Sequence, residues 1–374
     1  MKLFLQVGDK KMFKLCNIIK VMGLVGLVGL AGCDLSTPMH VGDDSKVPSN
    51  LHAVSYSSLP GWRDDDVRYA LQAFRNTCKA KIQYKGSVIP DPDLLREKCN
   101  MLPSASADVK TVRAWFESHF QPYQVYNENG GKKGTFTGYY SPVIDGCRKQ
   151  SAKCNEPIMG VPINGATYKG VPKKDIVEKK IGRVLYWANM VDVQNLQIQG
   201  SGMLKLEDGT LVKLNFAAVN DLPFKSIGGQ LKDRGIKPAG GYSADAVWTH
   251  LKQNPKLAKE VIYNNPRYVY FYETEQKSVI GKLGTPLSKI RSIAMDDSIY
   301  TLGLPVYINT NLSDGRTFNR LMIAQDTGGA IKGWIRADIF FGSGDEAYQV
   351  AHGQHSQGQM FILMPKEYTY VKPR

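Results

Sequence analysis

The spacing of apolar residues changes along the chain, and the change divides it into segments. Before residue 134 the apolar positions recur at helical spacing, first from Trp62 to Phe74 and then from Val109 to Phe120. Asp108 stands immediately before the second set, where an aspartate commonly caps a helix. The pattern therefore predicts two or three helices at the start of the folded part.

From Gly134 onwards apolar and polar residues alternate, which is typical of strands. The strongest signal is Asp208-Gly209, which lies between two alternating runs and predicts a hairpin. Further strands are predicted at 135–140, 184–187, 196–199, 268–272, 306–309, 320–325, 333–341 and 360–364.

A second helical segment interrupts the strands. Ser243 opens a helix, Asn254-Pro255 breaks it, and a further short helix runs to about Tyr263. The order of helices, strands, helices and strands predicts a mainly β protein with helices, in which one β domain is inserted into another. We expect an outer domain from residues 60–133 and 273–374 and an inserted domain from residues 134–272.

The N-terminus has the pattern of a lipoprotein signal peptide. Five lysines, at positions 2, 10, 11, 14 and 20, precede an apolar run at 21–31. The run is too short to span a bilayer and ends in Leu30-Ala31-Gly32-Cys33. We expect residues 1–32 to be removed, Cys33 to carry the lipid, and residues 33–59 to form a polar tether. Met12 as the start would give a signal of more usual length.

The composition adds few constraints. The chain has 374 residues, a hydrophobic content of 43% and a formal charge of +14. Its basic residues are spread along the chain rather than grouped in a block, so we predict no nucleic-acid partner and read the charge as a basic surface.

The cysteines fit an exported protein. Apart from Cys16 in the signal and Cys33, four remain, and four cysteines allow three connectivities. We favour the two sequence-local pairs, Cys78–Cys99 and Cys147–Cys154. We predict no metal site, because no C-x-x-C motif or nearby histidine accompanies them, and no cofactor.

The segment 324–347 reads AQDTGGAIKGWIRADIFFGSGDEA and combines three aspartates with glycines and large apolar residues. By the period of a strand, Arg336, Asp338 and Phe340 share one face. An apolar neighbour raises the pKa of a carboxyl and a cationic neighbour lowers it, so the sequence leaves the shift of Asp338 open.

Other motifs in the chain suggest competing kinds of site. Asp326-Thr327-Gly328 is the tripeptide of aspartic proteases, but a single-chain enzyme needs two copies, so only a homodimer could work. Ser201 lacks the Gly-x-Ser-x-Gly frame of a nucleophile. His352 and His355 lack the glutamate of a zinc-protease helix, and we interpret both as surface residues.

The segment 326–347 resembles the three-aspartate domain of the membrane-bound lytic murein transglycosylase A family. Phe136–Pro142, Gln197–Gly202 and Asn265–Val269 match that family as well, so the resemblance covers roughly Gly61 to the C-terminus. It implies a double-psi β-barrel as the outer domain, a smaller OB-like barrel inserted into it, and a polysaccharide groove between them.

The resemblance also implies the site. Asp338 maps to the single catalytic aspartate, with Asp326 and Asp345 as supporting neighbours. Candidate sugar contacts are Thr137, Gly138, Tyr139, Tyr140, Gln199, Gly200, Ser201, Gly202, Gly328, Gly329 and Lys332. For the two tyrosines, core packing is an equally good interpretation.

In such enzymes the acid protonates the glycosidic oxygen and then takes the proton of the muramic C6 hydroxyl, which closes on C1 as a 1,6-anhydro ring. The expected substrate is peptidoglycan glycan strands, and expected protein partners are those of cell-wall synthesis or division. The alternatives are a glycan-binding lipoprotein without activity and, less favoured, the dimeric aspartic protease.

The family implies a lipid-anchored protein in the periplasm of a Gram-negative bacterium, with the outer membrane favoured. Asp34 follows the lipidated cysteine, and such an aspartate keeps some lipoproteins in the inner membrane, so both membranes stay open.

Cys33→Ser should abolish lipidation and release the protein from membranes or leave it unprocessed, because the thiol is the lipid acceptor. Metabolic palmitate labelling followed by membrane fractionation measures both effects. Unchanged labelling of the variant would contradict the predicted lipidation.

Overall fold

Six strands close into a ring in which each strand is hydrogen-bonded to both neighbours. In ring order they are β14 (His355–Pro365), β11 (Pro305–Asn311), β12 (Thr317–Asp326), β10 (Ser292–Met295), β13 (Arg336–Ser343) and β3 (Gly134–Ser141), and β3 pairs back with β14. The β10–β12 and β13–β3 pairs are parallel and the others antiparallel. Closure leaves no edge within the ring.

The structure is a computed structural model that describes residues 48–80, 92–163, 165–276 and 278–368. These residues fall within one unit, Ser45–Arg374. The signal peptide, Cys33 and the first part of the predicted tether lie outside the described residues. Among the residues described, no helix is both long and apolar enough to cross a membrane.

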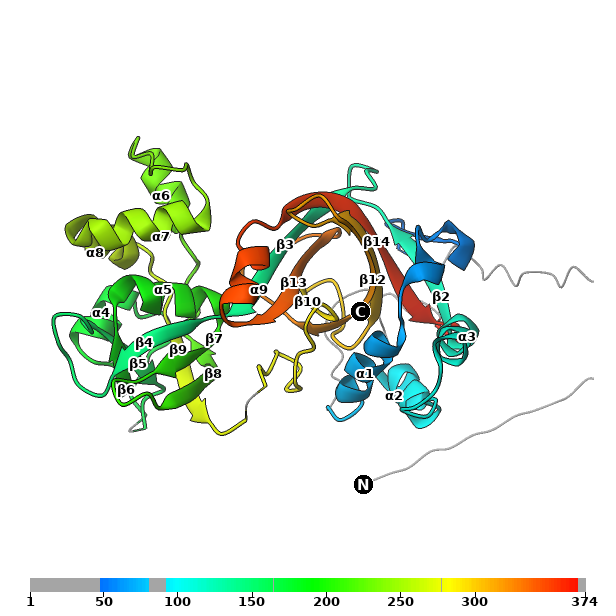
Figure 1. Cartoon of the computed structure of the whole chain (residues 1–374), viewed down its shortest axis with the longest axis horizontal. Helices are drawn as coiled ribbons and strands as arrows, with labels where there is room; N and C mark the ends of the chain where they lie inside the picture. Colours follow the sequence, from blue (N-terminus) through cyan, green and yellow to red (C-terminus); the bar gives the residue numbers. More distant parts are fainter. Residues whose placement is uncertain (1–47, 81–91, 164, 277, 369–374) are drawn as a thin grey trace, which may run out of the picture. The chain divides into compact units, whose positions relative to one another are not determined.

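Helices cover one side of the barrel (Figure 1). They are the short 3₁₀ turns η2 (Tyr56–Ser58) and η3 (Trp62–Asp64), followed by α1 (Arg68–Thr77), α2 (Pro92–Asn100) and α3 (Val109–His119). Asp108 caps α3 as predicted, because its carboxylate accepts the Thr111 N–H at 2.7 Å.

The predicted tether is too long at its C-terminal end. Strand β1 (Leu51–Ala53) pairs with β2 (Phe120–Val125), which pairs with β14. Leu51 and Leu59 are buried in the main core, so this segment is held by packing that its polar composition did not reveal.

The inserted region forms a second sheet in the order β5-β6-β4-β7-β8-β9. Its strands are β4 (Val143–Cys147), β5 (Glu156–Gly160), β6 (Arg183–Ala188), β7 (Ser201–Lys205), β8 (Leu211–Val219) and β9 (Val269–Thr274). The predicted hairpin at Asp208-Gly209 is confirmed, since β7 and β8 pair across it. Together the closed barrel and this sheet with its helices confirm the predicted fold class.

Helices of the insert gather beside this sheet (Figure 1). They are α4 (Lys173–Glu178), α5 (Met190–Gln199), α6 (Ile227–Asp233), α7 (Ala244–Gln253) and α8 (Pro255–Tyr263); a last helix, α9 (Gly344–Ala351), follows β13. The predicted helix start at Ser243 and the break before Pro255 are confirmed.

Two predictions about the insert are wrong. Residues 196–199 belong to α5 and not to a strand, because the apolar pair Leu196 and Ile198 is the end of a longer helix capped by Asn189. The insert does not begin at residue 134, because β3 pairs with β13 and β14 of the barrel. Alternation identified this strand but could not identify its partners.

The two faces of β13 meet different surroundings. Ala337, Ile339 and Phe341 pack into the main core, whereas Phe340 joins a smaller apolar cluster with Tyr139. This confirms the predicted alternation and places Asp338 on the side of that smaller cluster.

A buried ion pair ties the N-terminal helices to the barrel. The Arg291 guanidinium donates two hydrogen bonds to Asp65, at 2.9 and 2.7 Å, and the Leu321 N–H donates a third at 2.7 Å. Both side chains are at most 5% exposed. A bidentate pair with additional donors is the geometry in which burial of charge is tolerated.

The structure joins Cys78 to Cys99 and Cys147 to Cys154 as disulfides. This is the pairing that the sequence analysis favoured. The first links α1 to α2, and the second closes a short loop between β4 and β5.

Asp65→Ala should lower the free energy of unfolding by about 3–5 kcal/mol, because it leaves the Arg291 charge buried without its partner. The double variant Asp65→Leu with Arg291→Leu should lose clearly less free energy of unfolding, because it leaves no buried charge without a partner. Urea unfolding of both variants measures the difference. Equal losses in the single and double variants would show that the uncompensated charge is not the cause.

Candidate active site

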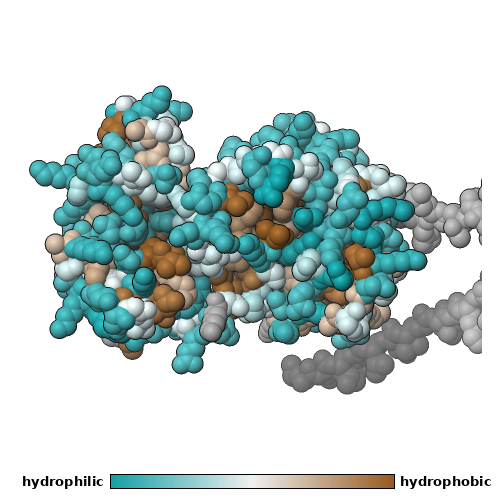
Figure 2. Space-filling view, viewed as in Figure 1, coloured by the Kyte–Doolittle hydropathy of each residue, from teal (hydrophilic) through white to brown (hydrophobic). Residues whose placement is uncertain are grey.

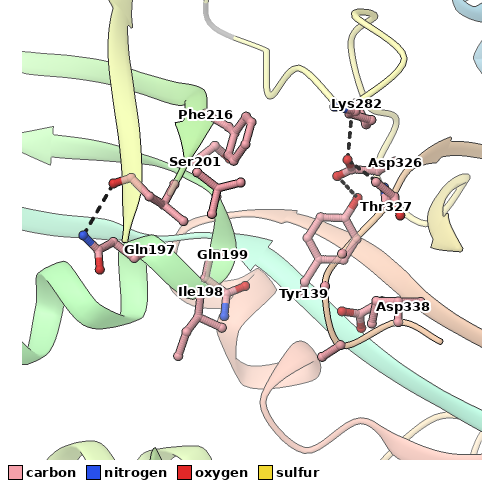
Figure 3. Close-up of a pocket in the computed structure, with 18 of the residues that line it drawn as sticks. Tyr139, Gln197, Ile198, Gln199, Ser201, Phe216, Lys282, Asp326, Thr327 and Asp338 are labelled. Carbon is pink, nitrogen blue, oxygen red and sulfur yellow. Dashed lines mark hydrogen bonds between the residues drawn. The ribbon is translucent and has the colours of Figure 1, made fainter. Parts of the chain in front are cut away.

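A groove of about 670 Å³ lies between the barrel and the insert. Its volume is within the range of roughly 300–1,000 Å³ that small-molecule sites commonly have. Residues of α5, β8 and β9 line it from the insert, and Asp326–Lys332 and Asp338 line it from the barrel. Figure 3 shows Ser201 and Phe216 on one side and Asp326 and Asp338 on the other, with Tyr139 between them.

Asp338 is held in a fixed orientation by the neighbouring strand. It lies opposite Thr137 in the β13–β3 register, and the Thr137 hydroxyl donates a hydrogen bond of 2.6 Å to its Oδ1. Arg336 in turn donates to the Thr137 oxygen at 2.8 Å. Burial raises the pKa of Asp338, and the Thr137 hydrogen bond and the Arg336 charge offset only part of that rise.

Asp326 ends β12 and lies in the same groove. Its Oδ1 accepts the backbone N–H groups of Lys282 and Thr327, both at 2.9 Å, and its Oδ2 accepts the Tyr139 hydroxyl at 3.0 Å. Burial raises its pKa to about 6 despite these three donors, and the nearby Asp338 carboxyl adds to the rise. Both carboxyls therefore hold protons more strongly than free aspartate does.

An apolar cluster explains this desolvation. Tyr139 and Phe340 pack with ring centroids 5.2 Å apart, together with Ala294 and Ile331. Tyr139 is 9% exposed, so it contacts the groove while it supports Asp326. Tyr139 therefore packs in the apolar cluster and also lines the groove.

The stretch at Gln199–Ser201 reaches the groove because a helix ends there. Gly200 has a φ of 77° and caps α5, and β7 begins at Ser201. Gln199, Gly200 and Ser201 line the groove, as do Gly328, Gly329 and Lys332. A side chain at Gly329 would approach the Arg267 guanidinium, which lies 3.5 Å from the position of a Cβ atom.

Five predicted site residues are not among the described residues that line the groove: Thr137, Gly138, Tyr140, Gly202 and Asp345. Thr137 reaches the site through Asp338. The two glycines serve packing, because a Cβ would lie 2.6 Å from the Phe341 ring at Gly138 and 2.4 Å from Leu196 at Gly202.

Tyr140 and Asp345 have other surroundings in the structure. The Tyr140 hydroxyl accepts a hydrogen bond from Asn195, and its ring packs on Tyr348. Asp345 is exposed in the first turn of α9, where a carboxylate stabilises a helix N-terminus. It is therefore not among the residues that line the groove with Asp338, which a local motif cannot show.

Sequence reasoning missed several groove residues. From the insert come three aromatic side chains that are partly exposed: Phe216 at 39%, Phe224 at 37% and Tyr272 at 43%. Arg267 and Asp297 line the groove as well. Figure 2 shows a mostly hydrophilic face with small hydrophobic patches, so exposed aromatic rings gathered in one groove are notable. Their separation in sequence left no local signal.

A buried lysine stiffens the wall of the groove. The Lys173 ammonium is fully buried and donates to Gln194 Oε1 at 2.7 Å and Gln197 Oε1 at 2.9 Å, and both glutamines line the groove. Burial lowers the pKa of Lys173 to about 8, although the Glu156 charge opposes this. In the part of the chain that the structure describes, no cluster of three His, Cys, Asp or Glu side chains is arranged to hold a metal ion.

Comparison with known proteins shows which proteins this chain is similar to. Residues 166–272 match the "MltA specific insert domain" and residues 291–364 match the "3D domain". The membrane-bound lytic murein transglycosylase A of Vibrio cholerae is 31% identical over 245 residues, which are 60% of this chain and 65% of that protein. This chain thus matches less than two thirds of that relative's length.

Solved structures are similar over more of the chain. A membrane-bound lytic murein transglycosylase from Agrobacterium tumefaciens is 27% identical with a TM-score of 0.76, covering 85% of this chain and 98% of that one. The lytic transglycosylase LtgG of Burkholderia pseudomallei is 31% identical with a TM-score of 0.56, covering 86% and 97%.

The raised pKa of Asp326 predicts a pH dependence of stability. The folded protein keeps this proton up to about pH 6, whereas an unfolded aspartate loses it near ~4. The wild type should therefore lose stability as the pH rises from about 4 to about 6, by up to about 2–3 kcal/mol from this group. The Asp326→Asn variant has no such loss, because its amide does not titrate. Its free energy of unfolding should therefore rise relative to that of the wild type over this pH interval.

Urea unfolding at pH 4, 5, 6 and 7 measures the difference between the two proteins. Asp314→Asn is a control of opposite sign, because the hydrogen bond from Arg316 lowers the pKa of Asp314 and stabilises the fold above about pH 4. If the free energies of unfolding of Asp326→Asn and the wild type differ by the same amount at every pH, the raised pKa assigned to Asp326 is contradicted.

Proposed function

Because this chain belongs to the membrane-bound lytic murein transglycosylase A family, we propose that it cleaves the β-1,4 bond between N-acetylmuramoyl and N-acetylglucosaminyl residues of peptidoglycan. The product is a 1,6-anhydromuramoyl end. The observation that carries this proposal is Asp338: a desolvated carboxyl in a groove, oriented by Thr137 and with a raised pKa.

Asp338 acts first as the general acid. Burial raises the pKa of Asp338, so this carboxyl keeps its proton to a higher pH than a free aspartate does, and that proton can be delivered to the glycosidic oxygen. The bond from C1 to that oxygen then breaks, and positive charge develops on the muramoyl ring. The Thr137 hydrogen bond stabilises the carboxylate that remains.

The same residue then acts as the base. The Asp338 carboxylate takes the proton of the C6 hydroxyl, and O6 bonds to C1. One bond breaks, one bond forms, the acid is regenerated, and no water is consumed. Ordinary glycosidases use a second carboxylate to attack the sugar or activate water. Asp326 is tied by three donors, which suits a supporting role that holds Tyr139 and the groove floor in place.

The groove suits a glycan on chemical grounds. Partly exposed Phe216 and Tyr272 offer apolar surfaces for the carbon faces of pyranose rings. Gln199, Ser201 and the backbone at Gly328 and Gly329 offer hydrogen-bonding groups for the ring edges. Lys332, which pairs with Asp296 at 2.8 Å, lies at the rim of the same groove.

We propose further that Cys33 carries a lipid that anchors the enzyme on the periplasmic side of a membrane, with the outer membrane favoured over the inner. The sequence box at 30–33 supports this, and the relatives from Vibrio cholerae and Agrobacterium tumefaciens are named as membrane-bound enzymes. Proteins of cell-wall synthesis or division are the expected partners.

Two other functions receive less support. A glycan-binding protein without activity would have no need for a desolvated, oriented carboxyl at Asp338. The dimeric protease requires Asp326 to face a second copy, but here its oxygens accept three hydrogen bonds from its own chain.

Asp338→Asn should lower the rate of murein digestion by on the order of 10⁴-fold, because one group serves both proton transfers. Binding to sacculi should persist, since the groove contacts come from other residues. Asp326→Asn should reduce the rate less, and Asp314→Asn, exposed in the turn between β11 and β12, serves as the matched control. The measurements are muropeptide analysis by mass spectrometry and cosedimentation with sacculi.

Digestion by Asp338→Asn at a rate near that of the wild type would refute the assignment of the acid. Products with reducing ends rather than anhydro ends would refute the ring-closure step. Sacculus binding by the wild type without any digestion would favour the glycan-binding alternative.

A further inference from the structure

One amide in the groove wall lacks the partners that buried amides normally have. Asn215 lies in β8, is 1% exposed and lines the groove. Neither its Oδ1 nor its Nδ2 has a hydrogen-bond partner in the part of the chain that the structure describes. A buried donor or acceptor without a partner destabilises the folded state, and native proteins keep few such groups.

The neighbours of Asn215 form a polar row across three strands. Ser201 of β7 and Tyr272 of β9 are its direct register partners. Residues directly opposite one another in antiparallel strands present their side chains on the same face, and all three line the groove. The row brings together a hydroxyl, an amide and a phenol ring, and Tyr272 is 43% exposed.

A second asparagine, Asn220, shows what a structural amide looks like in this fold. Five residues further on, it is fully buried, and its Nδ2 donates to Val171 O at 2.7 Å and Pro266 O at 2.8 Å. Its Oδ1 accepts the Tyr268 N–H at 2.9 Å. Asn215 has the same burial and the same chemistry without these bonds, so stability alone does not explain it.

We propose that Asn215 binds one sugar ring of the glycan directly. Its Oδ1 accepts the N–H of the 2-acetamido group, and its Nδ2 donates to the oxygen on the adjacent carbon C3. That oxygen is a hydroxyl in N-acetylglucosamine and an ether in N-acetylmuramic acid, and either one can accept. The inference rests on the proposed function, because it takes the ligand to be an acetamido glycan.

The surroundings make such a contact effective. The amide atoms are shielded from bulk water, so solvent competes little for the bonds that the sugar makes. The carbon face of the same ring can lie against an aromatic side chain of the row. Asn215 lines the groove from the insert, and Asp338 lines it from the barrel. A contact at Asn215 would therefore position the glycan relative to the catalytic acid.

The test separates binding from folding. In the Asp338→Asn background, which keeps the ligand intact, Asn215→Leu replaces the amide by an apolar side chain of similar size. Its melting temperature should stay the same or rise, because an unpaired buried amide is removed. Its Kd for the N-acetylglucosamine hexamer, measured by calorimetry, should rise on the order of tenfold for two lost hydrogen bonds.

Asn220→Leu in the same background is the matched control. It should lower the melting temperature, because it breaks three bonds, and leave the Kd within about twofold. Asn215→Asp is a second variant for the case that leucine prevents folding. It keeps an acceptor but not the donor, so it should lose part of the affinity.

An unchanged Kd in folded Asn215→Leu or Asn215→Asp overturns the proposal. A fall in the melting temperature of Asn215→Leu as large as that of Asn220→Leu also overturns it, because the amide would then have a structural partner. If the unmutated enzyme does not cleave murein but hexamer binding still depends on Asn215, the proposed reaction fails and this inference stands.

Discussion

The pairing of β13 with β3 is the constraint on which the rest of the structure depends. These strands are separated by about two hundred residues, as the 201-residue distance from Thr137 to Asp338 shows. Their parallel register closes the barrel and places the two side chains opposite each other. A shift of one residue would turn Asp338 into the main core and bring Ile339 to the groove.

The same closure requires the insert to leave and re-enter the barrel. The chain leaves after Ser141 at the end of β3 and completes the second sheet with β9, which ends at Thr274. The groove follows from this arrangement, because the ends of α5, β8 and β9 then line a cavity with the carboxyl-bearing strands of the barrel. The barrel supplies Asp338, and the insert supplies the exposed rings of Phe216 and Tyr272.

Buried polar groups in this protein divide into two kinds. Asp65 and Asn220 have their hydrogen bonds satisfied, and they tie separate elements together. Asp338 and Asn215 are also held away from water, but their partners are too few to compensate fully. A buried polar group with too few partners lowers the stability of the fold. Such groups are expected at sites that bind ligands or carry out chemistry.

The sequence by itself determined what depends on local spacing and local chemistry. It predicted the capped helices at Asp108 and Ser243, the hairpin at Asp208-Gly209, and the face of β13 that carries Asp338, because caps, turns and alternation act within a few residues. Its motifs also identified the family.

Only the tertiary structure decided the long-range contacts. It assigned β3 to the barrel and left Asp345 outside the lining of the groove. It also gathered Phe216, Tyr272, Arg267 and Asn215 into the groove that Asp338 lines. The sequence left open whether burial or the Arg336 charge has the larger effect on the pKa of Asp338. In the folded protein burial has the larger effect and raises this pKa. Desolvation depends on every side chain packed around a group, and these come from segments far apart in the chain.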